Sequence, residues 1–434
     1  ALELKEFLSC YIDNYWFHPL VRSKRWDGRV SFFNWNEQTI PIGLLPQFVK
    51  FCRKFDYEYK LNFSKEEIVN DISEDDFEEF YEAIFKESSF SPRDYQDECI
   101  KKALRIKRGV IESPTGSGKS LIIYSMIRFI MGTSEGKILL IVPNISLVNQ
   151  MFNDFKEYGW NQAETYCSLV FHKSKKINWD CPIIISTWQS IYKKGSSFFD
   201  KFGSVIVDET HGAKSNSIRT CLEKCVNAEY RIGLTGTMPD QKLDSFTIFG
   251  YLGPKIFEMK SSELIEKGIL SKIKIANIVI KYPKDTIDRY WHDSDDGKIK
   301  QNDYNEELND IYEFEERNKV FNYIIDKLDK SQNILILCHK ISHLKDIKKY
   351  LEDNFPSYDI HEIYGKTAAD DRERIRQLLD ESKIKIFLDE DSYIVVNKKD
   401  KVKLTNGQIK TGANININDD IDDNWIKSKK VFKK

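Results

Sequence analysis

A glycine-rich segment, Ser113-Pro-Thr-Gly-Ser-Gly-Lys-Ser120, limits how this chain can fold more than any other feature does. A short apolar run precedes it at 108–112, and an apolar helical pattern follows it at 121–127. Glycines let the backbone turn so that its N–H groups point at phosphate oxygens, and the start of the next helix adds a positive dipole. The order strand, glycine loop, helix therefore predicts a phosphate-binding loop on a parallel α/β sheet.

The polar residues of this loop have separate expected tasks. Lys119 would supply a positive charge to the outer phosphates, and Ser120 would offer a hydroxyl to Mg²⁺. A glycine-rich turn without function is the alternative, and the flanking strand and helix argue against it. The residues expected to bind the nucleotide here are Thr115, Gly116, Ser117, Gly118, Lys119 and Ser120.

A second apolar run, 205–207, ends in Asp208-Glu-Thr-His211. Open parallel sheets bind ligands at the carboxyl ends of their strands, so Asp208 is predicted to hold Mg²⁺ beside the loop. Glu209 is predicted to be the general base or to position the water that attacks the terminal phosphate. An Asp-Glu pair alone would indicate only a solvated strand end. The catalytic candidates are Lys119, Asp208, Glu209 and His211.

Composition narrows the class of protein. At roughly 150 residues per domain, a chain of 434 residues suggests about three domains. Its net charge is −2, from 66 basic and 68 acidic residues, so any nucleic-acid contact must come from local basic patches. Eight cysteines without a Cys-x-x-Cys pair argue against a zinc module. No apolar stretch reaches the ~20 residues that cross a membrane, and no signal-peptide pattern is present, so a cytoplasmic setting is expected.

The Asp-Glu-x-His form of 208–211 resembles the DExH group of superfamily 2 helicases and translocases. Further segments agree with that family in order and spacing: Ser91-Pro-Arg-Asp-Tyr-Gln96, Ile141–Gln150, Ile183–Gln189 and Gly233-Leu-Thr-Gly-Thr237. Each segment alone would be an ordinary strand end or helix start. Their common order is what carries the resemblance.

The resemblance implies a task for each of these segments. Arg93 and Gln96 would read the adenine of ATP. Pro143, Ser186 and Thr187 would touch the nucleic-acid backbone. Thr235 and Thr237 would couple hydrolysis to strand movement.

The residues before the loop resemble the start of phage UvsW-type DNA helicases. They are Tyr15-x-Phe-x-Pro19, Trp26-Asp-Gly-Arg29 and Pro41-x-Gly-Leu44. This likeness, over about residues 10–385, implies ATP-driven work on branched DNA in recombination, repair and replication, with RNA not excluded. Aromatic and basic residues in this part, Arg25 and Arg29 among them, could stack on bases and hold phosphates, or could form a small core. The Asp-Gly pair predicts a hairpin turn, and the acidic run 66–87 predicts a solvated helix or linker.

The second half resembles only part of a second RecA-like lobe. A helix is predicted from 315 to 328, a buried strand from 333 to 340, and a further strand near 363, whereas 273–281 alternates as a strand and 285–309 is polar. After residue 386 the family's Gln-x-x-Gly-Arg-x-x-Arg helix is missing. An arginine finger is worth a factor of about 10³ to 10⁵ in rate, so this absence matters. His339 and His343 indicate loop polarity or, alternatively, a metal site.

Residues 387–434 contain short strand patterns joined by Asn406-Gly407, which predict a β-rich appendage or the start of a self-splicing Hint-like insert. The expected fold is α/β: a RecA-like parallel-sheet lobe (89–262), a partial second RecA-like lobe (263–386), a small N-terminal α/β nucleic-acid-binding domain (1–88) and the β-rich tail. Three functions stay open. The chain is an ATP-dependent helicase or translocase, which we favour, or an impaired nucleic-acid-binding remnant, or half of a split helicase completed by another chain.

Overall fold

The computed structural model forms two compact units, Ala1–Lys272 and Ile273–Lys434. It describes residues 1–62, 69–86, 88–171, 177–214, 216–272, 275, 278–280, 291–293, 299–301, 304–327, 333–364, 367, 371, 374–375, 385–389, 401–403 and 409–411. The predicted domain boundaries after 88, 262 and 386 stay predictions.

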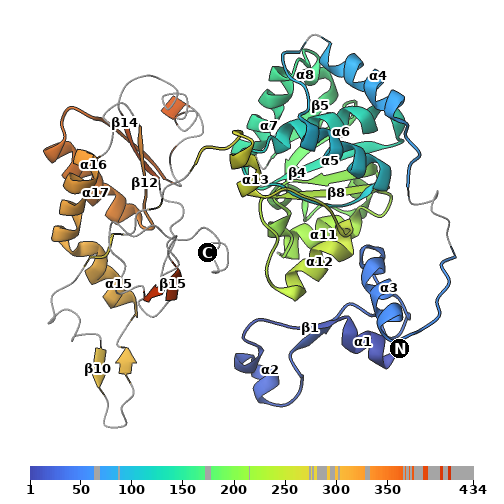
Figure 1. The fold of residues 1–434 in the computed structure, drawn as a ribbon, viewed down its shortest axis with the longest axis horizontal. Helices are drawn as coiled ribbons and strands as arrows, with labels where there is room; N and C mark the ends of the chain where they lie inside the picture. The colour runs from blue at the N-terminus through green and yellow to red at the C-terminus, as the bar shows by residue number, and fades with distance from the viewer. Residues whose placement is uncertain are drawn as a thin grey trace. The chain divides into compact units, whose positions relative to one another are not determined.

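The first unit is built on a seven-stranded sheet in which every pair of neighbouring strands is parallel. The spatial order is β5-β6-β4-β7-β8-β3-β9. The bounds are β3 Arg108–Glu112, β4 Lys137–Val142, β5 Cys167–Val170, β6 Ile183–Thr187, β7 Phe202–Val207, β8 Tyr230–Thr235 and β9 Lys255–Glu258. This sheet, with helices on both faces, confirms the predicted RecA-like lobe (Figure 1).

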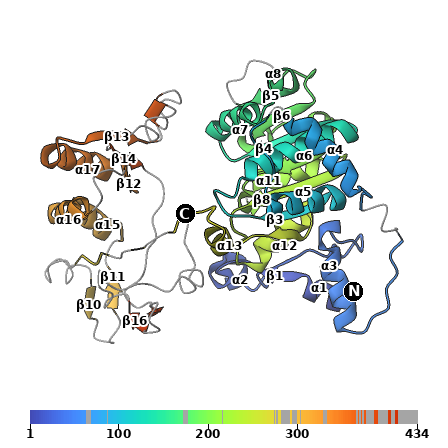
Figure 2. The same cartoon turned by 45° about the horizontal axis from the view of Figure 1, so that its top comes forward.

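Alternate residues of the strands feed two separate cores. In β7, Ile206 packs into the core on one face, while Val205 and Val207 pack into the core on the other. Both faces are thus apolar, as in parallel sheets covered on both sides. The helices of this lobe are α5 Asp94–Ile106, α6 Lys119–Thr133, α7 Ile145–Glu157, α8 Ala163–Tyr166, α9 Trp188–Ile191, α10 Ser196–Phe199, η3 Thr210–Lys214, α11 Asn216–Lys224, α12 Lys242–Leu252 and α13 Ser261–Glu266. Figure 2 labels α5, α6, α7, α8, α11, α12 and α13 around the sheet.

The acidic run before the lobe forms helix α4, Glu74–Phe85, in its described part. Ser73 caps it through Asp76, and three acidic residues occupy its first turn, where the helix dipole favours negative charge. Of the predicted solvated helix or linker, the helix is present, but it is not wholly solvated. Phe77 is fully buried and stacks on Phe129 of α6, so the helix is part of the lobe's core.

The first sixty residues form a small α/β module. Its elements are α1 Leu2–Phe7, β1 Ser9–Tyr11, η1 Tyr15–Phe17, α2 Pro19–Arg22, β2 Arg29–Ser31, η2 Ile42–Leu44 and α3 Leu45–Lys54. The predicted two-residue hairpin at Asp27-Gly28 is wrong. β2 pairs antiparallel with β1, so the connection between the two strands includes η1 and α2.

The second unit contains a three-stranded parallel sheet of order β12-β14-β13. The bounds are β10 Trp291–Asp293, β11 Ile299–Gln301, α15 Tyr304–Glu313, η4 Glu315–Lys319, α16 Val320–Lys327, β12 Ile334–Leu337, α17 Ile341–Asn354, β13 Asp359–Ile363, β14 Lys385–Asp389, β15 Lys401–Lys403 and β16 Ile409–Thr411. β10 pairs antiparallel with β11, and β15 with β16. The smaller parallel sheet agrees with a partial second RecA-like lobe.

Two local expectations in this unit need correction. The strand at 334–337 is only half buried, because Leu335 and Leu337 are 59% and 42% exposed. His343 does not lie in a polar loop: it is a buried residue of α17 whose ring packs 4.8 Å from that of Tyr312. Burial and the nearby Arg317 lower the pKa of His343 to about 4, so the ring is neutral at pH 7.

Several expectations lie outside the described residues: most of the strand at 273–281, the Asn406-Gly407 turn, and most of the tail. Across the described ranges no group of three or more His, Cys, Asp or Glu side chains could hold a metal ion, and no helix there is long and apolar enough to cross a bilayer. All eight cysteines are buried thiols without disulfides.

Candidate functional site

The sheet order brings the predicted segments to one edge. Parallel strands end at the same side, and β8 lies between β3 and β7. The glycine loop follows β3, Asp208 follows β7, and Thr235 ends β8. Thr235 therefore stands between the loop and the acidic pair, which sequence order alone does not reveal.

The loop has the backbone that phosphate binding requires. Gly116 and Gly118 have φ angles of 82° and 79°, in the left-handed region that side chains disfavour. Gly118 caps α6, so the N–H groups of that helix's first turn face the loop. The Lys119 ammonium donates to the Ser113 carbonyl oxygen at 3.3 Å. These features fit a bound phosphate chain.

Helix α5 supports the loop from behind. The Tyr95 hydroxyl donates to the Ser117 carbonyl oxygen at 2.6 Å, and the Gln96 amide nitrogen donates to the same oxygen at 2.9 Å. The amide oxygen of Gln96 accepts from the Arg93 backbone N–H at 2.9 Å. Gln96 is 1% exposed, so its amide is used inside the fold. Its reading of adenine, and that of Arg93, stay predictions.

Lys119 and the acidic pair meet. The Lys119 ammonium lies 3.3 Å from a carboxylate oxygen of Glu209, and the other oxygen of Glu209 lies 3.1 Å from Nδ1 of His211. Burial raises the pKa of Glu209, but the hydrogen bond from His211 and the charge of Lys119 outweigh burial and lower it to about 2. Glu209 is ionised across the physiological range.

Asp208 has the opposite electrostatic environment. It is 7% exposed, and its carboxylate accepts from the Glu209 backbone N–H at 3.0 Å. Burial, and then repulsion by Glu209, raise the pKa of Asp208 to about 6. The two neighbouring carboxylates differ because Glu209 contacts Lys119 and His211 directly, whereas these groups lower the pKa of Asp208 only in part. A nearby positive charge would relieve the cost of ionised Asp208.

His211 joins the acidic pair to β8. Its Nδ1 lies 3.1 Å from the Thr235 hydroxyl, which itself donates to the Thr237 carbonyl oxygen at 2.9 Å. Since the Thr235 proton is used there, both neighbours of Nδ1 can only accept, so the hydrogen-bond network assigns the proton to Nδ1. A continuous polar chain runs from Lys119 to Thr237.

Ser120, the second predicted Mg²⁺ ligand, is hydrogen-bonded on the side of α7. Its hydroxyl lies 2.7 Å from the hydroxyl of Tyr158, which follows α7. Burial raises the pKa of Asp154, and a hydrogen bond with Ser120 lowers it in part, so this carboxylate also lies beside Ser120. Neither Tyr158 nor Asp154 was expected here, because both are far from Ser120 in sequence and belong to no recognised pattern.

The residues predicted to touch nucleic acid differ in accessibility. Pro143 follows β4 at the same edge, and its carbonyl oxygen accepts from the exposed Gln189 at 3.3 Å. Ser186 and Thr187 are buried: the Ser186 hydroxyl donates to the Val170 carbonyl oxygen at 2.7 Å, and that of Thr187 lies 2.9 Å from Ser190. Exposed Gln189 was missed by sequence reasoning, although it lies within a quoted segment.

Arg25 and Arg29 lie in the small N-terminal module. Arg25 is exposed, and the Arg29 guanidinium donates to the Tyr11 hydroxyl at 2.7 Å and lies 4.6 Å from that ring's centre. Trp16 and Phe17 nearby in sequence are 54% and 61% exposed. This part of the module is an aromatic and cationic surface rather than a core.

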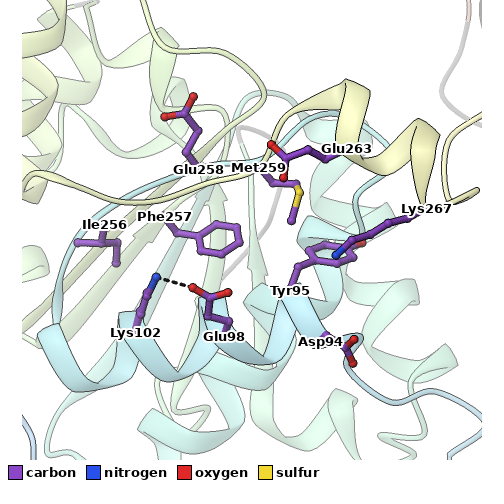
Figure 3. Close-up of a pocket in the computed structure, with 10 residues that line it drawn as sticks. All are labelled: Asp94, Tyr95, Glu98, Lys102, Ile256, Phe257, Glu258, Met259, Glu263 and Lys267. Carbon is purple, nitrogen blue, oxygen red and sulfur yellow. Dashed lines mark hydrogen bonds and ion pairs between the residues drawn. The ribbon is translucent and has the colours of Figure 1, made fainter.

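A pocket of about 340 Å³ lies between α5, β9 and α13 (Figure 3). Tyr95 lines it, and Lys267 reaches over the Tyr95 ring at 5.8 Å. Most of its lining is charged, with Glu98 and Lys102 forming an ion pair at 2.5 Å. This lining gives no reason to assign the pocket to an adenine ring.

Two family models match the chain: the N-terminal domain of the DNA helicase UvsW, over residues 1–62, and the res subunit of type III restriction enzymes, over residues 89–240. The second range contains the whole polar chain from Lys119 to Thr237. The ATP-dependent DNA helicase uvsW of Enterobacteria phage T4 is 29% identical over 387 residues, which are 88% of this chain and 74% of the phage protein. These matches show that the chain is similar to superfamily 2 helicases over most of its length. This similarity supports an ATP-hydrolysing enzyme of the DNA helicase type.

Other comparisons agree with this similarity to helicases. A crystal structure of the UvsW helicase from bacteriophage T4 aligns with a TM-score of 0.54 at 29% identity, covering 59% of this chain and 92% of that one. A second T4 UvsW structure covers 92% of this chain and 78% of its own, also with a TM-score of 0.54. The DNA 3'-5' translocase XPB2 of Sulfurisphaera tokodaii is 27% identical over 46% of this chain and 42% of the translocase.

Proposed function

We propose that this helicase uses ATP hydrolysis to move along DNA and acts on branched DNA in recombination, repair and replication. The proposal depends on one observation: Glu209, which follows Asp208, contacts both Lys119 and His211. His211 in turn contacts the hydroxyl of Thr235. Likeness to the T4 helicase along most of its length supports DNA as the substrate. If the chain is encoded by a phage, its place of action is the host cytoplasm.

In the proposed reaction the loop N–H groups and Lys119 bind the phosphates of ATP. Lys119 would exchange its contact with Glu209 for the outer phosphates, which frees the carboxylate for water. A carboxylate with a pKa of about 2 is a weak base, so losing Lys119 would bring Glu209 closer to a useful pKa. Glu209 would then position the water and accept its proton, while His211 holds the carboxylate in place.

Ser120 and Asp208 are the residues that would hold Mg²⁺. The fit rests on Asp208, since a buried carboxylate next to a second carboxylate is destabilised as an anion unless a cation is near. Bound Mg²⁺ supplies neutralisation of the charge that develops on the phosphates.

Thr235 and Thr237 would couple ATP hydrolysis at this site to movement of the DNA-contacting segments, since Thr235 is hydrogen-bonded directly to His211. The proposed DNA-contacting positions on the lobe are Pro143, Ser186 and Thr187. Because the last two side chains are buried, their contribution would be to hold the turn that presents exposed Gln189. Arg25 and Arg29, beside exposed aromatic rings, would bind DNA at the N-terminal module.

Two substitutions test the proposal. Lys119→Ala should abolish hydrolysis, and Glu209→Gln should keep nucleotide binding while turnover falls at least a hundredfold, the range of general-base effects. Nucleotide binding is measured by fluorescence anisotropy, and turnover by phosphate release with and without branched DNA. A Lys119→Ala rate within a few-fold of the parent would refute the site.

A second candidate is a nucleotide-binding protein that turns over poorly. It is favoured by one observation: residues 377–434 contain no arginine, so this segment cannot supply one to the terminal phosphate. Another chain could supply it, as in a split helicase. Equal and slow phosphate release with and without DNA would support this candidate.

A further inference from the structure

The hydroxyl of Ser120 is hydrogen-bonded to a residue that has no part in the proposed reaction. It lies 2.7 Å from the Tyr158 hydroxyl, whereas the described residues include no hydrogen bond between Ser120 and Asp208. Ser120 and Asp208 are the two residues that would share a metal ion. In the structure one of them is turned toward α7 instead.

Tyr158 is buried and held by the packing of its ring. It is 9% exposed, and its ring packs against Phe90 at 5.0 Å and Tyr124 at 5.4 Å between ring centres. A buried tyrosine hydroxyl needs a hydrogen-bond partner, because leaving one unpaired costs free energy. The Ser120 hydroxyl is that partner. The neighbouring carboxylate of Asp154 is half buried and can only accept, so Ser120 donates its proton to Asp154 and Tyr158 donates its own to the Ser120 oxygen.

We propose that Tyr158 is a positioning residue that competes with the metal ion for the Ser120 hydroxyl and so lowers the affinity of the site for Mg²⁺. A metal bound by the Ser120 oxygen competes with the proton that Tyr158 donates to that oxygen, and loss of this bond on loading would free the end of α7. The first turn of the same helix follows Pro143, where DNA contact is proposed. This inference rests on the proposed function, since it takes Ser120 to be a metal ligand.

The test is a Mg²⁺ titration of nucleotide binding, without turnover. Protein is mixed with a fluorescent ADP analogue, and anisotropy is followed as MgCl₂ is added from an EDTA-buffered start. Tyr158→Phe removes only the hydroxyl and keeps the ring packing. The Mg²⁺ concentration at half-saturation should fall about fivefold, a factor equal to about 1 kcal/mol, which is the net worth of one hydrogen bond. Nucleotide affinity without Mg²⁺ should not change.

Tyr230→Phe is the matched control. Tyr230 is also buried, and its hydroxyl also has a partner, Asn70, but it begins β8, at the end of the sheet opposite Ser120. This variant should titrate like the parent. A general loss of packing would shift both variants and would also move the affinity measured in EDTA.

A double-mutant cycle separates the remaining outcomes. In a Ser120→Ala background, Tyr158→Phe should have no further effect, because both changes break the same bond. An unchanged or higher half-saturation point in Tyr158→Phe, or an equal shift in the Ser120→Ala background, overturns the inference and leaves the proposed function standing. A parent protein whose nucleotide binding ignores Mg²⁺ also overturns this inference, whereas the proposed function is overturned separately, by a Lys119→Ala rate within a few-fold of the parent.

Discussion

At the scale of single residues, two adjacent carboxylates show how position sets chemistry. Glu209 faces a lysine and a histidine, so the folded protein favours its charge, whereas Asp208 is buried without a bonded cation, so the folded protein opposes its charge. The pair therefore has opposite effects on stability as pH changes. That difference can be measured in buffer without metal or nucleotide.

Asp208→Asn should stabilise the metal-free protein at pH 7.5. The pKa of Asp208 is raised from 3.8 to about 6, so the folded state binds its proton more tightly than the unfolded state. The cost of ionising Asp208 is absent below pH 3.8, develops as pH rises, and is complete above about 6. The shift corresponds to an upper bound of about 3 kcal/mol. Urea unfolding in EDTA at pH 4 and 7.5 should show a gain for the variant only at the higher pH.

Glu209→Gln is the comparison at the same scale, and it should have the opposite sign. The pKa of Glu209 is lowered from 4.5 to about 2, so its ionised form stabilises the fold above pH 4.5, and this contribution is lost as pH falls toward 2. The variant should therefore be less stable than the parent at pH 7.5. Equal stabilities of parent and both variants at pH 7.5 would contradict the electrostatic account of the pair.

At the scale of elements, α12 joins the N-terminal module to the RecA-like lobe. Phe246 of this helix is buried in the module's core, and Leu252 in the lobe's core. η2 packs so closely on α12 that a Cβ on Gly43 would lie 1.7 Å from the Phe249 carbonyl oxygen. The absence of a side chain at Gly43 is what permits this contact.

Gly43→Ala should weaken the docking of the module on α12. The added methyl group cannot fit against backbone atoms, so the module must shift, at a cost of about 1–3 kcal/mol. Limited proteolysis and urea unfolding measure the effect. Gly132→Ala is the control, because a Cβ there meets nothing within 4 Å, and alanine within helix α6 should stabilise by about 0.5–1 kcal/mol. A Gly43→Ala protein as stable as the parent would show that η2 adapts freely.

At the scale of the whole molecule, residues 1–272 form one compact unit that contains the entire polar chain from Lys119 to Thr237. The second unit contributes a smaller parallel sheet. We therefore expect the first unit to bind nucleotide without the second unit, whereas DNA-stimulated hydrolysis should need both. Helicase motors need two lobes whose relative movement follows the nucleotide state.

A fragment of residues 1–272 should fold, bind a fluorescent ADP analogue with an affinity within a few-fold of the full chain, and lose DNA-stimulated phosphate release. Circular dichroism and anisotropy check folding and binding, and phosphate release checks coupling. Glu209→Gln in the full chain is the control for binding without turnover. DNA-stimulated release by the fragment that equals the full chain's would contradict a two-lobe motor.

The sequence alone determined the parallel α/β lobe, the loop at 113–120 and the identity of the acidic pair. Short, continuously apolar strands that alternate along the chain with helices, together with a glycine-rich turn, have few other stable arrangements. It also suggested the partial second sheet. It predicted the wrong strand partner for β2 and a polar loop where His343 is buried in a helix. Both errors arise because strand pairing and burial depend on segments distant in the chain.

Only the tertiary structure decided which side chains meet. Strand order placed Thr235 beside His211, and helix packing placed Tyr158 beside Ser120. The same order left Asp208 and Glu209 with opposite pKa shifts. Local patterns determine elements because they depend on neighbouring residues. Hydrogen-bond partners and burial depend on distances through space, which become defined only when the elements pack.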